Sequence, residues 1–173
     1  ETTNEGRELW ITNGTEQGTS LITDNVAGSS NPRILPPMLN QLFFVAEIGA
    51  SGIELWKTDG TPVGTTLVKN VGEEQTHSDP RELTPYDGSL LFLCDDGVVG
   101  TELWRSDGTS PGTTPVSTGP GDQSFDPPFQ VGLTSLTDKV VFFGARDNTT
   151  TLDIWTSTGF PAETYIGASL AAA

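Results

Sequence analysis

Short apolar runs separated by turn-forming residues pattern the whole chain. In the clearest stretch, the run Leu90–Leu93 has the length of a buried strand and follows Asp87-Gly88, a strong hairpin signal. No ten-residue segment has a helical period, and Gly and Pro recur every few positions. The pattern therefore predicts an all-β fold, with strands in this stretch at 81–85, 89–94, 101–105 and 113–117 and a loop at 95–100.

One motif recurs along the chain. The segment Glu8–Thr15 returns as Glu54–Thr61 and Glu102–Thr109, each followed three residues later by Gly-Thr, and a degenerate copy starts at Asp153. The tryptophans at 10, 56, 104 and 155 are thus 46, 48 and 51 residues apart. A second series keeps the same step: Pro32, Pro80 and Pro127 precede the runs Phe43-Phe44, Leu91-Phe92 and Phe142-Phe143. Two series in step indicate a structural repeat.

Four short strands in about 47 residues are typical of one β-propeller blade. We expect a half blade at 1–29, then whole blades at 30–76, 77–124 and 125–173, the last with a degenerate motif. This makes a partial ring of four-stranded antiparallel blades. Closed propellers need about four to eight blades, so we expect the chain to be a fragment whose other blades lie in the same polypeptide. The terminal Ala171-Ala172-Ala173 also looks unlike a natural domain end.

The shared pattern Glu-Leu-Trp-x-Thr/Ser-Asp-Gly-Thr-x-x-Gly-Thr resembles the ELWxxDGT repeat of large secreted or cell-surface proteins. The resemblance covers nearly the whole chain. It implies a repeat architecture and an extracellular location, and it implies no catalytic activity. The fourth copy departs from the pattern, with Thr158 at the turn Asp, Phe160 at the following Thr and Glu163 at the second Gly.

The motif's acidic turn allows two interpretations. Asp59 and Asp107, with Asn13 at the equivalent position, could bind calcium, because carboxylates in Gly-rich loops are ligands for hard cations. A calcium site needs six or more oxygens, however, whereas each loop offers one carboxylate. We therefore expect Asn13, Asp59 and Asp107 to cap turns, with Gly14, Gly60 and Gly108 supplying positive φ, and we expect no metal site.

The repeated aromatic and acidic strand residues also have a structural and a chemical interpretation. Trp10, Trp56, Trp104 and Trp155 could stack on sugar rings, but one Trp at the same place in every blade favours inter-blade packing. Glu8, Glu54 and Glu102 occur as three equivalent copies and not as one distinguished acid pair. A repeated structural hydrogen bond is the favoured role for them.

No catalytic site is indicated by the remaining candidates. Cys94 aligns with Ala46 and Ala145 and is interpreted as a buried space-filling residue. His77 is the lone histidine, so neither a catalytic triad nor a metal cluster can be built on it. The sequence therefore predicts a protein that is not an enzyme.

The net charge of the chain makes some classes of binding partner unfavourable. The 173 residues carry 23 acidic and 8 basic side chains, a net charge of -15, which disfavours nucleic acid and anionic membrane surfaces. No apolar run is long enough to insert in a membrane. Asn13-Gly14-Thr15 and Asn148-Thr149-Thr150 are weak candidate sequons for N-glycosylation, of which Asn148 is the better acceptor.

The function we expect is that of a structural or assembly module of a secreted or cell-surface protein. Its partners would be other chains or further blades, contacted through the variable loops at 48–52, 95–100 and 147–151. The alternative is a carbohydrate-binding propeller, with calcium as a possible cofactor. A sialidase-like hydrolase, which would need an arginine cluster at the ring centre, ranks last, because the five arginines are few and mostly linked to the repeat.

Overall fold

The structure is a computed structural model, and it describes residues 6–24, 28–35, 37–38, 41–72, 77–98, 100–116, 132–145, 152–160 and 164–170. These residues form fourteen β-strands and no helix. Among them there is accordingly no helix of the length and hydropathy that a membrane span requires. The chain divides into two compact units, Glu1–Asp79 and Pro80–Ala173.

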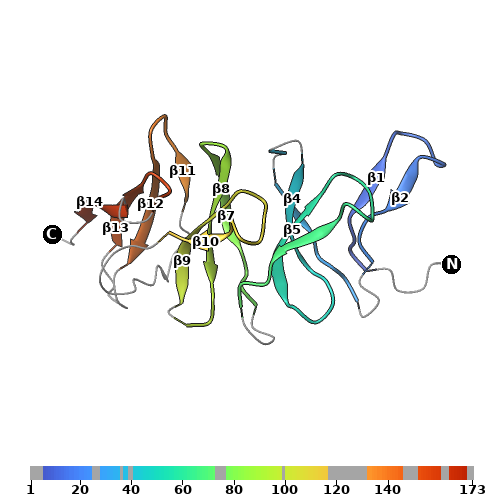
Figure 1. Cartoon of the computed structure of the whole chain (residues 1–173), viewed down its shortest axis with the longest axis horizontal. Helices are drawn as coiled ribbons and strands as arrows, with labels where there is room; N and C mark the ends of the chain where they lie inside the picture. Colours follow the sequence, from blue (N-terminus) through green and yellow to red (C-terminus); the bar gives the residue numbers. More distant parts are fainter. Residues whose placement is uncertain are drawn as a thin grey trace. The chain divides into compact units, whose positions relative to one another are not determined.

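The N-terminal unit contains two antiparallel sheets. The first is a pair, β1 (Trp10–Thr12) with β2 (Thr19–Leu21), and the second has four strands in the order β3-β4-β5-β6. Figure 1 shows the blue pair β1 and β2 separate from the sheet that holds β4 and β5. The bounds of the four-stranded sheet are β3 Arg33–Ile34, β4 Leu42–Glu47, β5 Ile53–Thr58 and β6 Thr66–Lys69.

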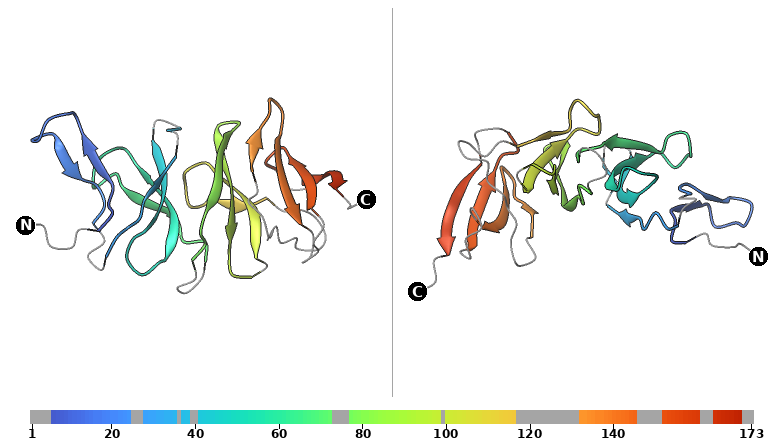
Figure 2. Two further views of the ribbon diagram at one scale, coloured as in Figure 1. Left: turned by 180° about the vertical axis from the view of Figure 1, so that it is seen from behind. Right: turned by 90° about the horizontal axis from the view of Figure 1, so that it is seen from below.

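The C-terminal unit contains two four-stranded antiparallel sheets, ordered β7-β8-β9-β10 and β11-β12-β13-β14. Both views of Figure 2 show them as separate sheets, the first green to yellow and the second orange to red. Their bounds are β7 Arg81–Tyr86, β8 Ser89–Asp95, β9 Thr101–Ser106, β10 Thr114–Pro115, β11 Thr134–Ser135, β12 Val140–Ala145, β13 Leu152–Ser157 and β14 Thr164–Leu170.

The strand pattern of the sequence reappears with small shifts. Asp87 and Gly88 both have positive φ, 45° and 67°, as a tight two-residue hairpin requires. The fourth strand of this sheet is shorter than expected, Thr114–Pro115 in place of 113–117. Pro115 has no N–H to donate to a neighbouring strand, so it fits only an edge position such as β10.

In every four-stranded sheet, the register places a Phe of the second strand opposite the Trp of the third. The pairs are Phe44–Trp56, Phe92–Trp104 and Phe142–Trp155. The last pair is stacked, with ring centroids 6.3 Å apart and planes 16° from parallel. This register corrects the alignment of the fourth copy: the residue equivalent to Ala46 and Cys94 is Gly144, opposite Asp153, and not Ala145.

Each unit has an apolar core between its two sheets. In the N-terminal unit, Leu9 and Ile22 from the two-stranded part pack with Phe44 and Ala46, and Trp56 lies against this cluster. In the C-terminal unit the core joins side chains from both sheets: Leu91, Leu93, Leu103, Val116, Leu133, Val140, Phe142 and Trp155. Burying the facing sides of neighbouring sheets in this way is how blades stabilise one another.

Candidate functional site

The best-defined feature of the first three repeats is the loop after the strand that carries the motif Trp. We call this loop the signature turn (residues 12–19, 58–65 and 106–113). In the second copy, Asp59 Oδ1 accepts hydrogen bonds from the N–H and the hydroxyl of Thr61, at 2.9 and 2.7 Å. The Thr61 hydroxyl oxygen in turn accepts the Gly64 N–H at 2.9 Å. A short chain of bonds therefore runs from the Asp side chain to the second Gly of the motif.

The same bonds recur in the first and third signature turns. Asn13 Oδ1 accepts from Thr15 at 3.0 and 2.8 Å, and Asp107 Oδ1 accepts from Thr109 at 2.8 and 2.7 Å. An amide oxygen therefore replaces a carboxylate oxygen without changing the turn. What this position needs is an acceptor, whether or not it carries a charge.

A second set of bonds closes the base of the signature turn. The hydroxyls of Thr58 and Thr65 lie 2.8 Å apart, and the Thr58 hydroxyl oxygen accepts the Gly60 N–H at 2.9 Å. Gly60 has a φ of 91°, and Gly14 and Gly108 have 90° and 85°, in the region that favours glycine. The turn glycines expected from the sequence therefore all lie at positive φ.

The second glycine of the motif is required for a different reason, which the sequence did not reveal: a Cβ there would overlap with the capping side chain. A Cβ at Gly64 would lie 2.0 Å from Asp59 Oδ1, and a Cβ at Gly112 would lie 2.1 Å from Asp107 Oδ1. Gly18 stands in the same relation to Asn13, at 1.9 Å. The capping side chain occupies the space that any other residue would need. The recurrence of this Gly in three copies was the available signal.

The carboxylates of Asp59 and Asp107 accept hydrogen bonds within their own signature turns, and these bonds lower their pKa values. Hydrogen bonds from the Thr61 hydroxyl and N–H lower the pKa of Asp59, and those from Thr109 lower the pKa of Asp107 in the same way. Across the described ranges, no group of three or more His, Cys, Asp or Glu side chains is placed to hold a metal ion.

The degenerate fourth copy keeps part of the turn. Gly159 has a φ of 80°, and its N–H binds the Ser157 hydroxyl oxygen at 3.0 Å, as Gly60 binds Thr58. Phe160 stands where the other copies have Thr, and the Arg105 guanidinium lies over its ring, 4.4 Å from the centroid. The lost turn residue is thus replaced by a contact with the preceding sheet of the same unit.

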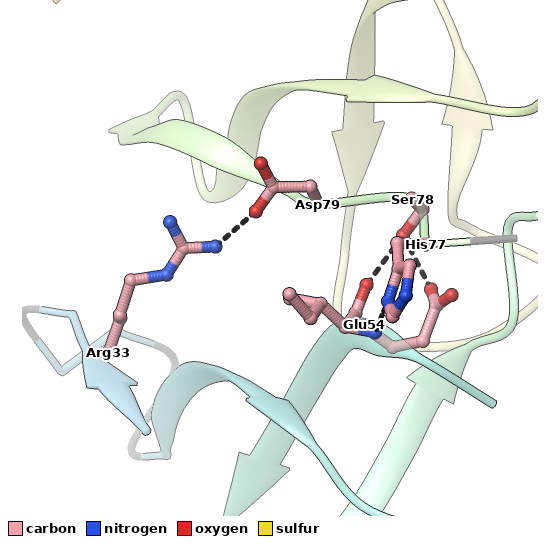
Figure 3. Close-up of polar contacts among 6 residues, drawn as sticks. Arg33, Glu54, His77, Ser78 and Asp79 are labelled. Carbon is pink, nitrogen blue, oxygen red and sulfur yellow. Dashed lines mark hydrogen bonds and ion pairs between the residues drawn. The ribbon is translucent and has the colours of Figure 1, made fainter. Parts of the chain in front are cut away.

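A second feature occurs in the first two repeats and joins the Glu strand to the linker that follows its sheet; we call it the linker clamp (7–8 with 29–31, and 53–54 with 77–79). Glu54 is fully buried, and its carboxylate accepts the Ser78 hydroxyl at 2.6 Å. His77 Nδ1 accepts the Ile53 N–H at 3.1 Å, and the Asp79 N–H binds the Ile53 carbonyl at 3.2 Å. Figure 3 shows His77 and Ser78 against the start of β5, with Ser78 directed at Glu54.

The first copy of the linker clamp has the same contacts with different side chains. Glu8 accepts the Ser30 N–H at 2.9 Å and also the Ser30 hydroxyl. The Arg7 N–H binds the Ser29 hydroxyl oxygen at 2.8 Å, where the second copy uses an imidazole. The motif glutamates therefore hold the chain between blades. The linker after Glu102 lies outside the described residues.

The buried carboxyl group of the second linker clamp, that of Glu54, has a shifted pKa. Desolvation raises the pKa of Glu54, opposed by its bonds to Ser78 and Val71. Glu54 Oε1 has no hydrogen-bond partner within the described part of the chain. On its outer side the clamp carries an ion pair between Arg33 and Asp79, 2.5 Å long, which is half-exposed and adds little stability (Figure 3).

The four tryptophans divide into two groups. Trp104 and Trp155 are 4% exposed and Trp56 is half-buried. Trp155 belongs to the apolar core of the C-terminal unit, and Trp56 packs against that of the N-terminal unit. Trp10 departs from the expected interior packing, because its side chain is 50% exposed. The strand of each of the other three tryptophans pairs with a second strand that carries the Phe opposite the Trp. The Trp10 strand, β1, pairs only with β2 in the described structure.

The remaining candidates are Cys94, the two candidate sequons and the variable loops. Cys94 is buried on β8, opposite Glu102. Asn13 is exposed but uses Oδ1 in its signature turn, and Asn148 lies outside the described residues. Of the variable loops, 48–52 is described in full, 95–100 except for Val99, and 147–151 not at all.

The sequence matches no protein-family model and no curated protein. Among solved structures, the chain is similar to a prolyl endopeptidase, with a TM-score of 0.60 and 11% identity over 96% of this chain. It is also similar to TolB from Acinetobacter baumannii, with a TM-score of 0.53 and 11% identity over 94% of this chain. The chain spans only 23% and 38% of the length of these two proteins. Both likenesses are to β-propellers, which confirms the predicted fold class.

Proposed function

We propose that this chain is a non-catalytic β-propeller repeat module that serves in the assembly of a larger secreted or cell-surface protein through protein–protein contacts. The observation that carries the proposal is the use of the motif side chains. Asp59 and Asp107 cap turns, Glu8 and Glu54 hold linkers, and Trp104 and Trp155 are buried. The repeated residues thus stabilise the blades, which leaves recognition to what varies between them.

The extracellular part of the proposal is supported by the resemblance to the ELWxxDGT repeat. An acidic chain with one buried cysteine is compatible with that setting. Three good copies of the motif carry the resemblance, and the hydrogen bonds of the signature turn give the Asp or Asn and the following Thr a physical reason to recur.

Contacts are most easily accommodated at the variable loops. At the end of β8, Asp95 accepts the N–H of Gly97 at 2.7 Å, and in the following loop Asp96 accepts the N–H of Val98 at 2.9 Å. Val98 is 81% exposed at the tip. An apolar side chain beside carboxylates suits a protein surface that offers an apolar patch and basic side chains.

Exchange of loops 48–52 and 95–100 for Gly-Ser segments tests the proposal. Binding partners would be captured by cross-linking in the source material, with the unaltered chain and a Ser110→Ala chain as matched controls. The expected result is loss of a protein partner from the loop variant while its circular dichroism spectrum is unchanged. Unchanged capture, or selective glycan binding that a chelator abolishes, would contradict the proposal and favour the carbohydrate-binding alternative.

A further inference from the structure

Asn13 differs in one chemical respect from the residues at the same position of the other two signature turns, because its side chain is an amide. It precedes Gly14, just as Asp59 and Asp107 precede a glycine. The carbon of a side-chain amide can be attacked by the backbone nitrogen of the next residue, and a glycine, which has no Cβ, hinders that attack least. The first signature turn therefore places an electrophilic carbon next to an unhindered nucleophile.

The turn holds the Asn13 side chain by its oxygen. The Thr15 N–H and hydroxyl donate to Asn13 Oδ1 at 3.0 and 2.8 Å. Because a backbone N–H can only donate, the atom that it meets is the amide oxygen and not the amide nitrogen. Among the described residues, Asn13 Nδ2 donates no hydrogen bond, and the side chain is exposed. The nitrogen that deamidation would release as ammonia therefore faces water.

The attacking nitrogen, that of Gly14, lies on an open side of the turn. Its N–H donates to the Thr12 hydroxyl oxygen at 3.0 Å, which fixes the direction of the peptide group. Gly14 is exposed, and a Cβ placed on it would meet no atom within 4 Å. In the described part of the chain, the space around this residue is thus open to the solvent base and the water that deamidation needs.

We propose that Asn13 is a self-modification site, at which the first signature turn converts its amide to the aspartate that the other two copies carry. The Gly14 nitrogen loses its proton to a solvent base and bonds to Asn13 Cγ, while Nδ2 takes up a proton and leaves as ammonia. A cyclic succinimide remains. Water then adds to Cγ, the bond from Cγ to the Gly14 nitrogen breaks, and that nitrogen recovers its proton. The net reaction consumes water, releases ammonia and restores the backbone.

The two donors of Thr15 act on both steps. In each step the oxygen on Asn13 Cγ becomes negatively charged as the nucleophile adds, and donors that are already in place stabilise that charge. In the second step, water could instead add to the backbone carbonyl carbon of the ring, which gives isoaspartate and routes the chain through the side chain. Donors on the Cγ oxygen favour addition at Cγ, so we expect aspartate as the main product.

The aspartate product fits the signature turn, whereas isoaspartate does not. Asp59 and Asp107 accept the same pair of donors in their own turns. Isoaspartate would add a carbon to the backbone and draw the carboxylate away from the space over Gly18, where the Asn13 amide lies. Conversion also removes the nitrogen to which a glycan would be attached at the candidate sequon, so glycosylation of Asn13 and its conversion exclude each other.

Incubation of the full, unglycosylated chain at neutral pH, followed by mass spectrometry of its peptides, tests the proposal. The folded chain is compared with the same chain unfolded in urea, and exposed Asn70, which precedes Val71, is the internal reference that should stay unconverted. The Asn13 peptide should change from amide to acid at least about tenfold faster in the folded chain, because only there are the two donors in place. Chromatography against an Asn13→Asp chain should identify aspartate as the main product of the folded chain.

A matched pair of variants isolates the hydroxyl donor. Thr15→Ser keeps both donors and should convert at the rate of the unaltered chain, whereas Thr15→Val loses the hydroxyl and should convert at least about threefold more slowly. If Thr15→Val also opens the turn, its rate should fall to that of the chain in urea. Conversion that is no faster in the folded chain, isoaspartate as its main product, or equal rates of the two variants would each overturn the proposal.

Discussion

At the scale of single residues, the polar side chains of the motif form hydrogen bonds with one another and with the backbone of the turn. Sequence patterns predicted the turn role of Asn13, Asp59 and Asp107, because Asn and Asp before Gly are a strong turn signal. They could not show that Gly64 or Gly112 is required, because that depends on where the Asp side chain folds back. The required space is a property of the folded turn and has no local sequence preference.

Replacement of the turn acceptor tests this role. Asp107→Ala removes the acceptor for two bonds from Thr109, so we expect a loss of about 1 kcal/mol in the free energy of unfolding, measured with urea. Asp107→Asn is the matched control and should stay within about 0.5 kcal/mol, because Asn13 makes the same bonds in the first copy. An Asn variant as unstable as the Ala variant would show that the charge itself matters.

The contact between Asp107 and Gly112 predicts strong non-additivity. Gly112→Ala should destabilise the chain by about 1–3 kcal/mol, because the new Cβ meets Asp107 Oδ1. In an Asp107→Ala background the same change should cost much less, since the obstructing carboxylate is gone. A double-mutant cycle by urea unfolding measures this coupling; additive costs would show that the two residues do not meet.

Glu54 predicts a pH dependence opposite to that of the turn aspartates. Burial raises the pKa of Glu54, so its proton is held more tightly in the folded state, and this contribution to stability is lost as the pH rises above the ordinary value of 4.5. The lowered pKa of Asp107 acts the other way: its contribution is lost as the pH falls below the ordinary value of 3.8.

The Glu54→Gln variant isolates the first effect, because it cannot titrate. Urea unfolding at a series of pH values should show the unaltered chain gaining stability relative to the variant as the pH falls from neutral to acid. A difference that stays constant, or that grows with rising pH, would mean that Glu54 is not held in a desolvated site.

At the scale of elements, the linker clamp holds the linker that leaves a sheet against the third strand of that sheet. The sequence indicated a repeated hydrogen bond for the glutamates but gave no partner, because Glu54 and Ser78 are 24 residues apart. A signal existed: Ser30 and Ser78 each lie two residues before a repeated Pro. Trp10 and the fourth-copy alignment were mispredicted because both depend on which strand lies beside the Trp.

Loss of the clamp hydroxyl should be costly. Ser78→Ala leaves the buried Glu54 carboxylate without its 2.6 Å partner, so we expect a loss of about 2 kcal/mol in the free energy of unfolding. Ser110→Ala, at an exposed turn position, is the control and should change stability by less than about 0.5 kcal/mol. Equal effects of the two variants by urea unfolding would remove the clamp from the account of stability.

At the scale of the whole molecule, the class of fold was predictable and the partner was not. Period, strand length and glycine positions together predict blades, since each reflects backbone requirements that every copy must meet. In the proposed function, recognition would use loops that differ from copy to copy, such as 48–52 and 95–100, so no repeated signal would identify it. The net charge of -15 disfavours nucleic acid and anionic membrane surfaces as partners, but it identifies no partner.

Hydrogen exchange of the backbone amides, followed by NMR across the full chain, tests the central claim most directly. If the repeats are blades with Phe opposite Trp, the amides of Phe44, Phe92 and Phe142 exchange slowest, while those of Trp10 and Thr12 on the open edge exchange fast. Fast exchange throughout β4, β8 and β12, or slow exchange at Trp10 and Thr12 in the chain alone, would contradict the account.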